Sequence, residues 1–580
     1  MKILGISDGM TGGAALIEDG TLRYAVNEER LLRAKMAIGF PAASIRKTLE
    51  DTGTRVEEVD AIAIATINEF FRKEAHAYDG WMQHQQTWPK ELLLNVSSVV
   101  NQLLGDAPLL KRSYYRIKSL TGRRRRQAIT EVLRRERGFR CPIQFIDHHL
   151  AHAASAYFTS GMRDATVITM DGAGDNISSR VYTARDGRLH QWNAVDSFNS
   201  LGNYYAYITH LCGFKAHHHE GKITGLAAYG EPRYAEILRR FITYEKGRTV
   251  NTGRVFYWAA LKALKKALPE PFEHKHLASS MQQVLEEVGC AYIRHWLNRT
   301  GGRHLALAGG VFANVRLNQR VHELEQVRSV FIHPGMGDEG LAVGAAFAVA
   351  STLASASGSG LLPRTLPDVY LGPGYSERQI EEAIQAAGLE ADDVPDIERR
   401  IAELLAEGAV VARFDGRMEY GPRALGSRSV LYQTTDPTVN DWLNKRLRRT
   451  EFMPFAPVTL AAYADQFFVG VDGARDAARF MTITFDCTPW MKRHCPAVVH
   501  VDGTARPQLI EERINPSYYR ILEEYRRLTG LPSVINTSFN MHEEPIVCSP
   551  MDAIRSFQEG GLEYLAMGNV LLANPAAPKR

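Results

Sequence analysis

Two stretches of the chain repeat one pattern of apolar and polar positions. Residues 3–29 and residues 167–195 each begin with an apolar run, pass a turn rich in glycine and aspartate, and continue with a second run. A tight Asp-Gly turn, Asp19-Gly20 or Asp186-Gly187, then leads to a third run. Asp-Gly between alternating runs is a strong signal for a β-hairpin. The pattern therefore predicts two copies of a three-stranded unit.

Helical sequence follows each copy, which favours a duplicated α/β domain with its ligand in the central cleft. Actin, sugar kinases and Hsp70-type ATPases share that plan. The glycines between the first two strands let backbone N–H groups approach a phosphate or a metal-bound ligand. The alternative is that the two stretches are unrelated, because any α/β protein contains strand–turn–strand units.

Apolar patterning also divides the chain into domains. The apolar run at 341–353 is short for a membrane span and rich in Ala and Gly, so it predicts a tightly packed core helix. Residues 353–374 contain SASGSG and three prolines, which indicates a linker. We expect one domain at 1–355 and a smaller one at 366–580. Within the second, 376–407 is predicted helical and 409–415 a buried strand.

Composition narrows the class of protein. A chain of 580 residues is too long for a single core, and its net charge of +4 does not by itself imply nucleic acid. The chain starts directly with a predicted strand, so no secretion signal is visible. Six scattered cysteines without a CxxC pair fit a reducing cytoplasm and argue against a zinc ribbon. We expect a cytoplasmic protein that does not bind membranes.

A basic tract at 111–140 includes Arg123-Arg124-Arg125-Arg126. One interpretation is a polyanion-binding segment. The other is a solvated helical insertion, which we favour because Glu131 and Glu136 interrupt the run.

Two histidines suggest a metal site. His148 and His152 are four residues apart, so on a helix both imidazoles lie on one face. Glycine-flanked aspartates follow in MDGAGD (Asp171) and HPGMGDEG (Asp338). Two imidazoles and a carboxylate leave room for substrate on a divalent metal. A histidine pair alone is more often polar surface, and the paired aspartates favour the metal.

Two further segments carry candidate chemistry. Gly309-Gly310 follows a short apolar strand and precedes a helix start at Asn314, a combination that can bind an anion or a nucleotide. The segment EGKITGLAAYG places Glu220 and Lys222 beside small residues. It is equally compatible with a packed turn that carries a surface ion pair.

The C-terminal part concentrates arginines in turns. Guanidinium groups bind phosphate oxygens in pairs, and small polar residues supply further donors. Arg423, Arg428, Arg449 and Arg506 lie beside Gly, Ser and Pro, and Asn536, Ser538 and Asn540 follow a short strand. No P-loop signature is present. One interpretation is a phosphate-rich substrate in a basic cleft, and the other is scattered surface arginines. We favour the first, because these arginines lie in turns with Gly, Pro and Ser and not on exposed helix faces.

With these motifs in order, the chain resembles the ATP-dependent O-carbamoyltransferases of nodulation-factor and antibiotic pathways, the NodU/CmcH type. The resemblance covers essentially the whole chain. It rests on HHLAHAASAY, MDGAGD, EGKITGLAAYG, AGGVFAN, HPGMGDEG, MEYGPRALGSRS, EFMPFAP, HVDGTARPQ and NTSFNMHEEPIV. It implies an actin-like N-terminal domain and a smaller YrdC-like C-terminal α/β domain. It also implies that carbamoyl phosphate and ATP, with Mg, give carbamoyl-adenylate, from which a hydroxyl of an acceptor takes the carbamoyl group.

The resemblance also implies roles for residues. The metal ligands are expected to be His148, His152, Asp171 and Asp338, with iron(II) or another divalent metal as the ion. The carbamoyl phosphate and ATP site is expected to use Arg423, Arg428, Arg449, Arg506, Asn536, Ser538 and Asn540. Adenylate in the N-terminal domain is expected near Gly309, Gly310 and Asn314.

The chain departs from the family pattern at several positions. The His-Asp pair of the family's first hairpin aligns with Met10 and Thr11, so a candidate base for the acceptor hydroxyl is missing. Leu447, Thr450 and Met453 replace charged residues around the EFMPFAP motif. Glu220, Asp8, Lys222 or a histidine of 217–219 is a candidate replacement in the transfer chemistry, and the sequence does not choose among them.

We therefore expect a carbamoyltransferase that acts on a small-molecule alcohol, a sugar or a natural product. The sequence leaves open whether the protein forms a homodimer. One alternative is a tRNA-directed modification enzyme, based on the basic tract. Another is a non-catalytic ligand-binding relative, based on Met10. The acceptor cannot be read from the chain, because loops that carry no transferable code build such pockets.

Overall fold

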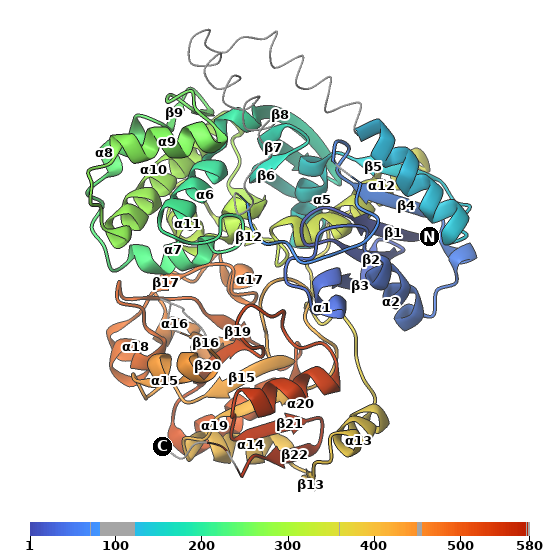
Figure 1. The fold of residues 1–580 in the computed structure, drawn as a ribbon, viewed down its shortest axis with the longest axis vertical. Helices are drawn as coiled ribbons and strands as arrows, with labels where there is room; N and C mark the ends of the chain where they lie inside the picture. Colours follow the sequence, from blue (N-terminus) through green and yellow to red (C-terminus); the bar gives the residue numbers. More distant parts are fainter. Residues whose placement is uncertain (70, 82–121, 359, 449–454, 576, 578–580) are drawn as a thin grey trace.

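The computed structural model describes residues 1–69, 71–81, 122–358, 360–448, 455–575 and 577. Figure 1 shows an N-terminal half, blue to yellow-green, stacked along the long axis on a C-terminal half, orange to red. Two five-stranded sheets lie in the N-terminal half and an eight-stranded sheet lies in the C-terminal half.

The two N-terminal sheets have the same topology. In each, three antiparallel strands come first, the fourth strand lies parallel beside the first, and the fifth lies parallel beside the fourth. The first sheet has the order β3 (Thr21–Asn27), β2 (Gly13–Glu18), β1 (Lys2–Ser7), β4 (Ala61–Ala65), β5 (Ile143–Ile146). The second has the order β8 (Arg188–Asp196), β7 (Ile177–Arg185), β6 (Asp164–Gly174), β11 (His304–Ala308), β12 (Ser329–Ile332).

The two predicted Asp-Gly turns connect equivalent strands, β2 to β3 and β7 to β8. Asp19 and Gly20 have φ of 50° and 73°, and Asp186 and Gly187 have φ of 45° and 82°. Positive φ at both central residues is what a type I′ hairpin turn requires. The predicted duplication is therefore confirmed.

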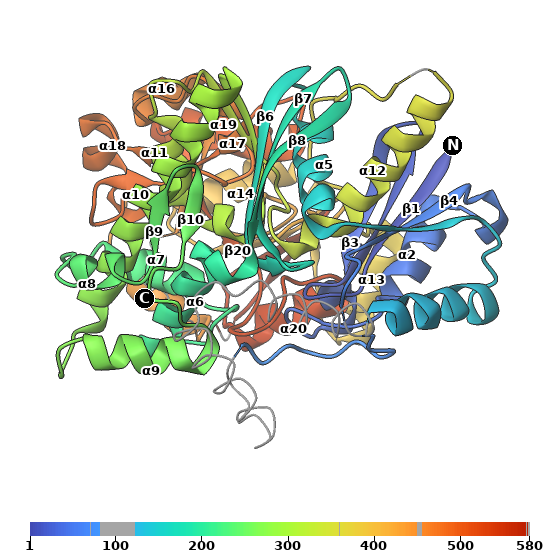
Figure 2. The same ribbon diagram turned by 90° about the horizontal axis from the view of Figure 1, so that it is seen from above.

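Helices α5 (His148–Ser160) and α12 (Leu341–Ala356) follow the fifth strand of each sheet and pack against each other between the sheets (Figure 2). A Cβ atom added to Gly344 of α12 would lie 1.8 Å from the carbonyl oxygen of Ala151 in α5. The small residues of α12 therefore allow the two backbones to touch. The segment Asp338–Ala356 is long and apolar enough to cross a membrane, but 61% of its apolar window is buried inside the protein. It is the predicted core helix.

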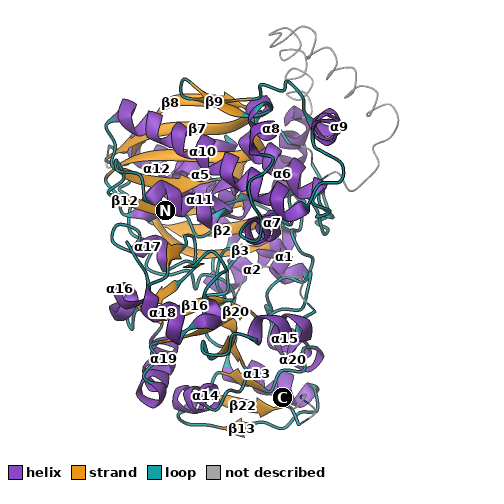
Figure 3. Ribbon diagram, turned by 90° about the vertical axis from the view of Figure 1, so that its left-hand side faces the viewer, coloured by secondary structure: helices purple, strands orange, loops and turns teal. Residues whose placement is uncertain are grey.

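The C-terminal sheet is mixed and has helices on both faces, as Figure 3 shows by secondary structure. Its order is β13 (Asp392–Asp393), β22 (Val570–Ala573), β21 (Tyr564–Met567), β14 (Val411–Phe414), β15 (Arg428–Tyr432), β20 (Ser533–Ser538), β16 (Ala456–Leu460), β19 (Gln508–Ile510). Helices α14 (Ile397–Ala406) and α19 (Pro516–Thr529) bury one face. Helices α13 (Glu377–Ala386), α15 (Val439–Arg446) and α20 (Pro550–Glu559) bury the other.

This α/β arrangement, a duplicated unit followed by a smaller α/β unit, confirms the expected fold class. The region predicted as helical at 376–407 forms two helices, α13 and α14, because the chain turns at Gly388 with φ of 65°. The strand predicted at 409–415 is β14. One apolar cluster runs from α10 (His274–Thr300) to the C-terminal strands, so the two halves pack against each other.

The remaining described elements surround these sheets. They are α1 (Glu28–Leu32), α2 (Ala42–Thr52), η1 (Val56–Glu58), η2 (Val132–Glu136), η3 (Ser197–Asn199), α6 (Leu201–Leu211), α7 (Glu220–Ala227), α8 (Ala235–Arg239), β9 (Thr243–Glu245), β10 (Arg248–Val250), α9 (Tyr257–Ala267), η4 (Gly310–Ala313), α11 (Val315–His322), η5 (Asp338–Gly340), η6 (Ala461–Tyr463), α16 (Ala464–Phe467), α17 (Arg475–Ala478), β17 (Phe485–Asp486), α18 (Pro489–His494), η7 (Pro496–Val498) and β18 (Thr504–Ala505).

Candidate functional site

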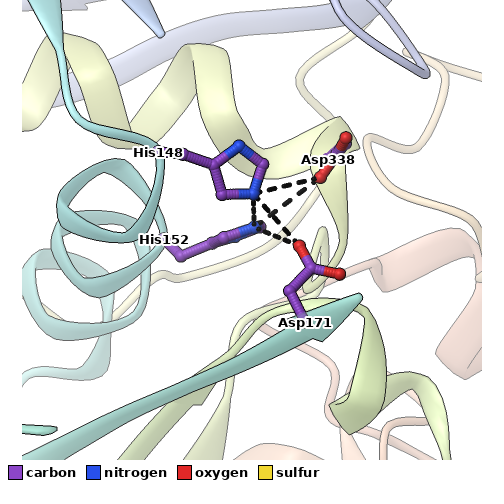
Figure 4. A group of neighbouring side chains, drawn as sticks. All are labelled: His148, His152, Asp171 and Asp338. Carbon is purple, nitrogen blue, oxygen red and sulfur yellow. Dashed lines mark hydrogen bonds and ion pairs between the residues drawn. The ribbon is translucent and has the colours of Figure 1, made fainter. Parts of the chain in front are cut away.

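The predicted histidine pair lies on the first turns of α5. Asp147 caps this helix by accepting a hydrogen bond from the backbone N–H of Leu150, at 3.0 Å. His148 and His152 are buried, and their Nε2 atoms are 3.1 Å apart. Asp171, near the end of β6, places Oδ2 at 3.1 Å from each of these nitrogens (Figure 4).

Asp338 completes the group from η5, which follows β12. Its Oδ1 lies 3.6 Å from Nε2 of His148 and 3.7 Å from Nε2 of His152. The four donor atoms all lie within 4.8 Å of one another. Two imidazole nitrogens and two carboxylate oxygens form a donor set suited to a divalent transition metal. The donor set therefore fits the expected metal.

Burial and the neighbouring side chains together set the pKa values in this group. Burial lowers the pKa of His148, but the carboxylates of Asp338 and Asp171 outweigh it and raise that pKa to about 9. Burial raises the pKa of Asp171, and the hydrogen bonds with His148 and His152 outweigh it and hold the pKa well below its usual range. Thr66 Oγ1 lies 3.1 Å from Nδ1 of His148 and fixes the orientation of the ring.

A cavity of about 470 Å³ lies beside the two carboxylates. Asp171 and Asp338 line it, together with Met10. Gly310 and Asn314 line it as expected for a nucleotide site. This cavity, which we call the carboxylate cavity, is thus bounded by both sheets of the N-terminal half.

Gly309 does not line the carboxylate cavity. Its N–H donates to the carbonyl of Met336 at 2.6 Å, and an added Cβ would lie 2.2 Å from the carbonyl oxygen of Met170. With φ of 106°, it allows the end of β11 to approach β6 closely. It therefore positions the backbone beside Gly310, and its expected place near adenylate stays a prediction.

The candidate replacements for the missing histidine lie in three different places. Glu220, at the start of α7, lines the carboxylate cavity and accepts a hydrogen bond from the N–H of His217 at 2.6 Å. Burial raises the pKa of Glu220 to about 7. Lys222 lines a second, neighbouring cavity together with the arginines described below. Asp8 is fully buried, forms an ion pair with Arg125 and does not line the carboxylate cavity, and its expected role as a base stays a prediction.

The expected phosphate-binding residues gather around a second cavity of about 300 Å³. Its described lining includes Arg423, Arg506, Asn536, Ser538 and Asn540. These residues come from the turn before β15, the segment between β18 and β19, and the strand β20 with the turn after it. We call it the arginine cavity.

Two expected phosphate ligands are not in this group. Arg428 is fully buried, lies 3.7 Å above the ring of Phe414, and donates to the carbonyls of Asp415 and Gly416 at 2.9 and 3.1 Å. It packs in the core of the C-terminal half and does not line the cavity, and its expected role in phosphate binding stays a prediction. Arg449 lies outside the described residues.

The carboxylate cavity and the arginine cavity are neighbours that share part of their walls. The shared residues include Lys35 and His218 from the N-terminal half and Arg423, Ser538 and Asn540 from the C-terminal half. The interface between the two halves therefore joins the histidine–aspartate group to the arginine group.

A second histidine–carboxylate group lies at this junction. Nε2 of His219 is 3.0 Å and Nε2 of His218 is 3.9 Å from carboxylate oxygens of Glu543. Donor atoms at these distances could hold a metal ion. However, Nζ of Lys215 lies 3.6 Å from the same carboxylate, and Lys35 and Lys222 act on the group electrostatically. Because these cations repel a divalent ion, we interpret it as an ion-paired contact between the halves.

The described part of the basic tract is built into the first sheet. Residues 122–131 are helical, and Ile129 and Leu133 pack on Ile62 and Ile64. Arg125 is buried, so the tract carries less exposed charge than its sequence indicates. Residues 111–121 of the tract lie outside the described part of the chain.

Comparison with known proteins identifies the family. Residues 2–347 match the model of the carbamoyltransferase N-terminus, and residues 402–574 match that of the carbamoyltransferase C-terminus. The chain belongs to the carbamoyltransferase family. The boundaries expected at 355 and 366 stay a prediction.

Similarity to individual proteins supports the same family. The chain is 32% identical to the nodulation protein NolNO of Sinorhizobium fredii, over 98% of this chain and 79% of that protein. It is 34% identical to the nodulation protein NolO of Bradyrhizobium diazoefficiens, over 74% of this chain and 78% of that protein. A solved structure of full-length HypF in its phosphate- and nucleotide-bound form aligns with a TM-score of 0.35 and 12% identity, over 61% of this chain and 55% of that one. Because this TM-score is low, the alignment gives no information about the fold beyond the strand topology described above.

Several residues at the junction were not expected from the sequence. Arg30 of α1 donates to the carbonyl of Gly421 at 2.9 Å, and Arg33 donates to the carbonyls of Ile546 and Pro545 at 2.6 and 2.7 Å. Lys35 follows in the same loop and lines both cavities. The cluster of basic residues directly after the first hairpin was a possible signal, but a basic run usually indicates solvated surface.

Proposed function

We propose that this protein transfers a carbamoyl group from carbamoyl phosphate, through carbamoyl-adenylate formed with ATP, to a hydroxyl of a small-molecule acceptor. The observation that carries the proposal is the shared wall of the two cavities. An arginine-lined cavity suits phosphate chemistry, a histidine–aspartate group suits a Lewis-acidic metal, and the two are adjacent across the interface.

Activation is assigned to the arginine cavity. Water hydrolyses carbamoyl phosphate to carbamate and inorganic phosphate, and a carbamate oxygen then attacks the α-phosphorus of ATP and displaces pyrophosphate. Arg423 and Arg506 line the space where negative charge develops, and guanidinium groups offset that charge. The product is a mixed anhydride that water would destroy, so a short internal route protects it.

Transfer is assigned to the carboxylate cavity. The acceptor hydroxyl attacks the carbamoyl carbon, the bond to the adenylate oxygen breaks, and AMP leaves. Glu220 lines this cavity, and a carboxyl with a pKa near 7 takes the hydroxyl proton efficiently at neutral pH. A divalent ion bound by His148, His152, Asp171 and Asp338, iron(II) by family resemblance, would supply Lewis-acid polarisation of the carbonyl.

The test combines purified protein, ATP with Mg, and carbamoyl phosphate carrying a labelled carbon with a panel of sugars and hydroxylated natural products. We expect labelled carbamate esters by mass spectrometry, together with one AMP and one pyrophosphate for each ester. Nodulation-type oligosaccharides enter the panel because relatives bear nodulation names. Including tRNA separates the alternative acceptor. Label on tRNA, or ligand binding without AMP, would contradict the proposal.

A further inference from the structure

We propose that Lys35 and Lys222, both from the N-terminal half, bind phosphate oxygens in the arginine cavity, so that the activation site is built across the interface. The inference rests on the proposed function, which assigns phosphate chemistry to that cavity. Neither lysine was expected there from the sequence, where Lys222 was a candidate for the transfer chemistry and Lys35 carried no role.

The charges that line the cavity support this inference. Its cationic side chains are Lys35 and Lys222 from one half and Arg423 and Arg506 from the other. Among the described residues that line it, Glu543 is the only acid. Lys222 has 8% of its surface exposed, so its ammonium group reaches the cavity from a largely buried position. Four cationic side chains around one cavity suit the oxygens of a phosphate-containing ligand.

The backbone around Lys35 is held firmly against the C-terminal half. Arg33, two residues earlier, donates to the carbonyls of Ile546 and Pro545. One residue later, the N–H of Met36 donates to the carboxylate of Glu29 at 2.7 Å. Contacts on both sides of Lys35 therefore hold its backbone at the junction, where the residue lines the cavity.

Glu543 and Lys35 line the same cavity and interact electrostatically. Burial raises the pKa of Glu543, but its hydrogen bond with His219 and the charges of His218 and Lys35 outweigh it and lower the pKa to about 2. Lys35 therefore lies within electrostatic reach of the anion that the cavity already contains. An entering phosphate would bind in the same field.

The experiment measures equilibrium binding by titration calorimetry, with inorganic phosphate, carbamoyl phosphate and Mg·ATP as separate ligands. The variants are Lys35→Gln and Lys222→Gln. Lys215→Gln is the matched control, since Lys215 also contacts Glu543 but lines neither cavity. A lost charge-assisted hydrogen bond weakens binding about tenfold or more, and we expect that loss in the two test variants and less than about twofold in the control.

Lys35→Arg keeps the charge, and we expect it to retain most of the affinity. The ligand whose binding falls identifies which phosphate each lysine holds. Wild-type binding with equal affinity in all three Gln variants would overturn the inference and leave the proposed function standing. Failure of the wild type to bind any of the three ligands would overturn both. Circular dichroism and a cooperative thermal transition verify that each variant is folded.

Discussion

Arg125 and Asp8, which are 117 residues apart in the sequence, form an ion pair with both side chains fully buried. Arg125 also donates to the carbonyls of Thr66 and Ala65, at 2.6 and 3.0 Å. Asp8 thus lines neither cavity, and one arginine of the basic tract is buried. The pair also ties the helix at 122–131 to the carboxyl ends of β1 and β4 in the first sheet.

This pair predicts a sharp difference between neighbouring arginines. Arg125→Met leaves the charge of Asp8 buried alone, which costs about 3–5 kcal/mol of unfolding free energy. Arg124 is exposed, and Arg124→Met is expected to change stability by less than about 0.5 kcal/mol. The double variant Asp8→Leu/Arg125→Met should recover part of the loss, because no unpaired charge is left. Urea unfolding checks this order, and equal midpoints for Arg124→Met and Arg125→Met would contradict it.

The fold was predictable where the signals are local. The two Asp-Gly turns, each between alternating runs, gave the duplicated three-stranded unit without any tertiary information. The i, i+4 spacing likewise placed His148 and His152 on one helical face. In such cases a few neighbouring residues determine the backbone, and tertiary packing agrees with them.

The site was less predictable where it depends on which way a charged side chain points. Arg423 and Arg428 are five residues apart in one motif, yet the first lines both cavities and the second is buried beside Phe414. The motif alone does not specify which of the two side chains faces the cavities. Strand β15 begins at Arg428, and the strand sets the direction of that side chain. Lys35 was missed for the same reason, since contacts with the distant C-terminal half give it its position.

The metal site predicts selective loss of metal. His148→Ala or Asp171→Asn removes a donor from the group, and the remaining three cannot close the site. We expect metal content well below one ion per chain in both variants, measured by elemental analysis after purification. His190, exposed on β8, provides the control, and His190→Ala should keep the wild-type content. Full metal in both folded test variants would show that these residues are not ligands.

Glu220 predicts the pH dependence of transfer. A general base must be deprotonated, so product formation should rise as pH passes through the Glu220 pKa of about 7. Glu220→Gln should lower the rate about 100-fold or more and remove that limb of the profile. Glu286 is a half-buried carboxyl whose pKa is likewise raised by burial, but it lines neither cavity, and Glu286→Gln should keep the limb. A limb that persists in Glu220→Gln would assign the proton transfer to another group.

The arginine cavity predicts which substitutions stop activation. Arg423→Ala and Arg506→Ala should each reduce pyrophosphate release from ATP and carbamoyl phosphate by about 100-fold or more, because each removes a cation from the developing charge. Metal content should not change. Arg513, exposed and paired with Glu511, is the control, and Arg513→Ala should release pyrophosphate at the wild-type rate. Near wild-type release in both cavity variants would refute the assignment.

The two neighbouring cavities predict a division of labour. His152 belongs to the group beside the carboxylate cavity and lines no part of the arginine cavity. His152→Ala should therefore still form carbamoyl-adenylate from carbamoyl phosphate and ATP, yet transfer no carbamoyl group. The stranded intermediate should hydrolyse, so AMP accumulates without product. Measuring AMP and carbamoylated acceptor side by side decides the point, with Arg423→Ala as the converse case that forms neither. If His152→Ala loses AMP formation as completely as product formation, the two chemistries share one site, and the two-cavity mechanism is wrong for this protein.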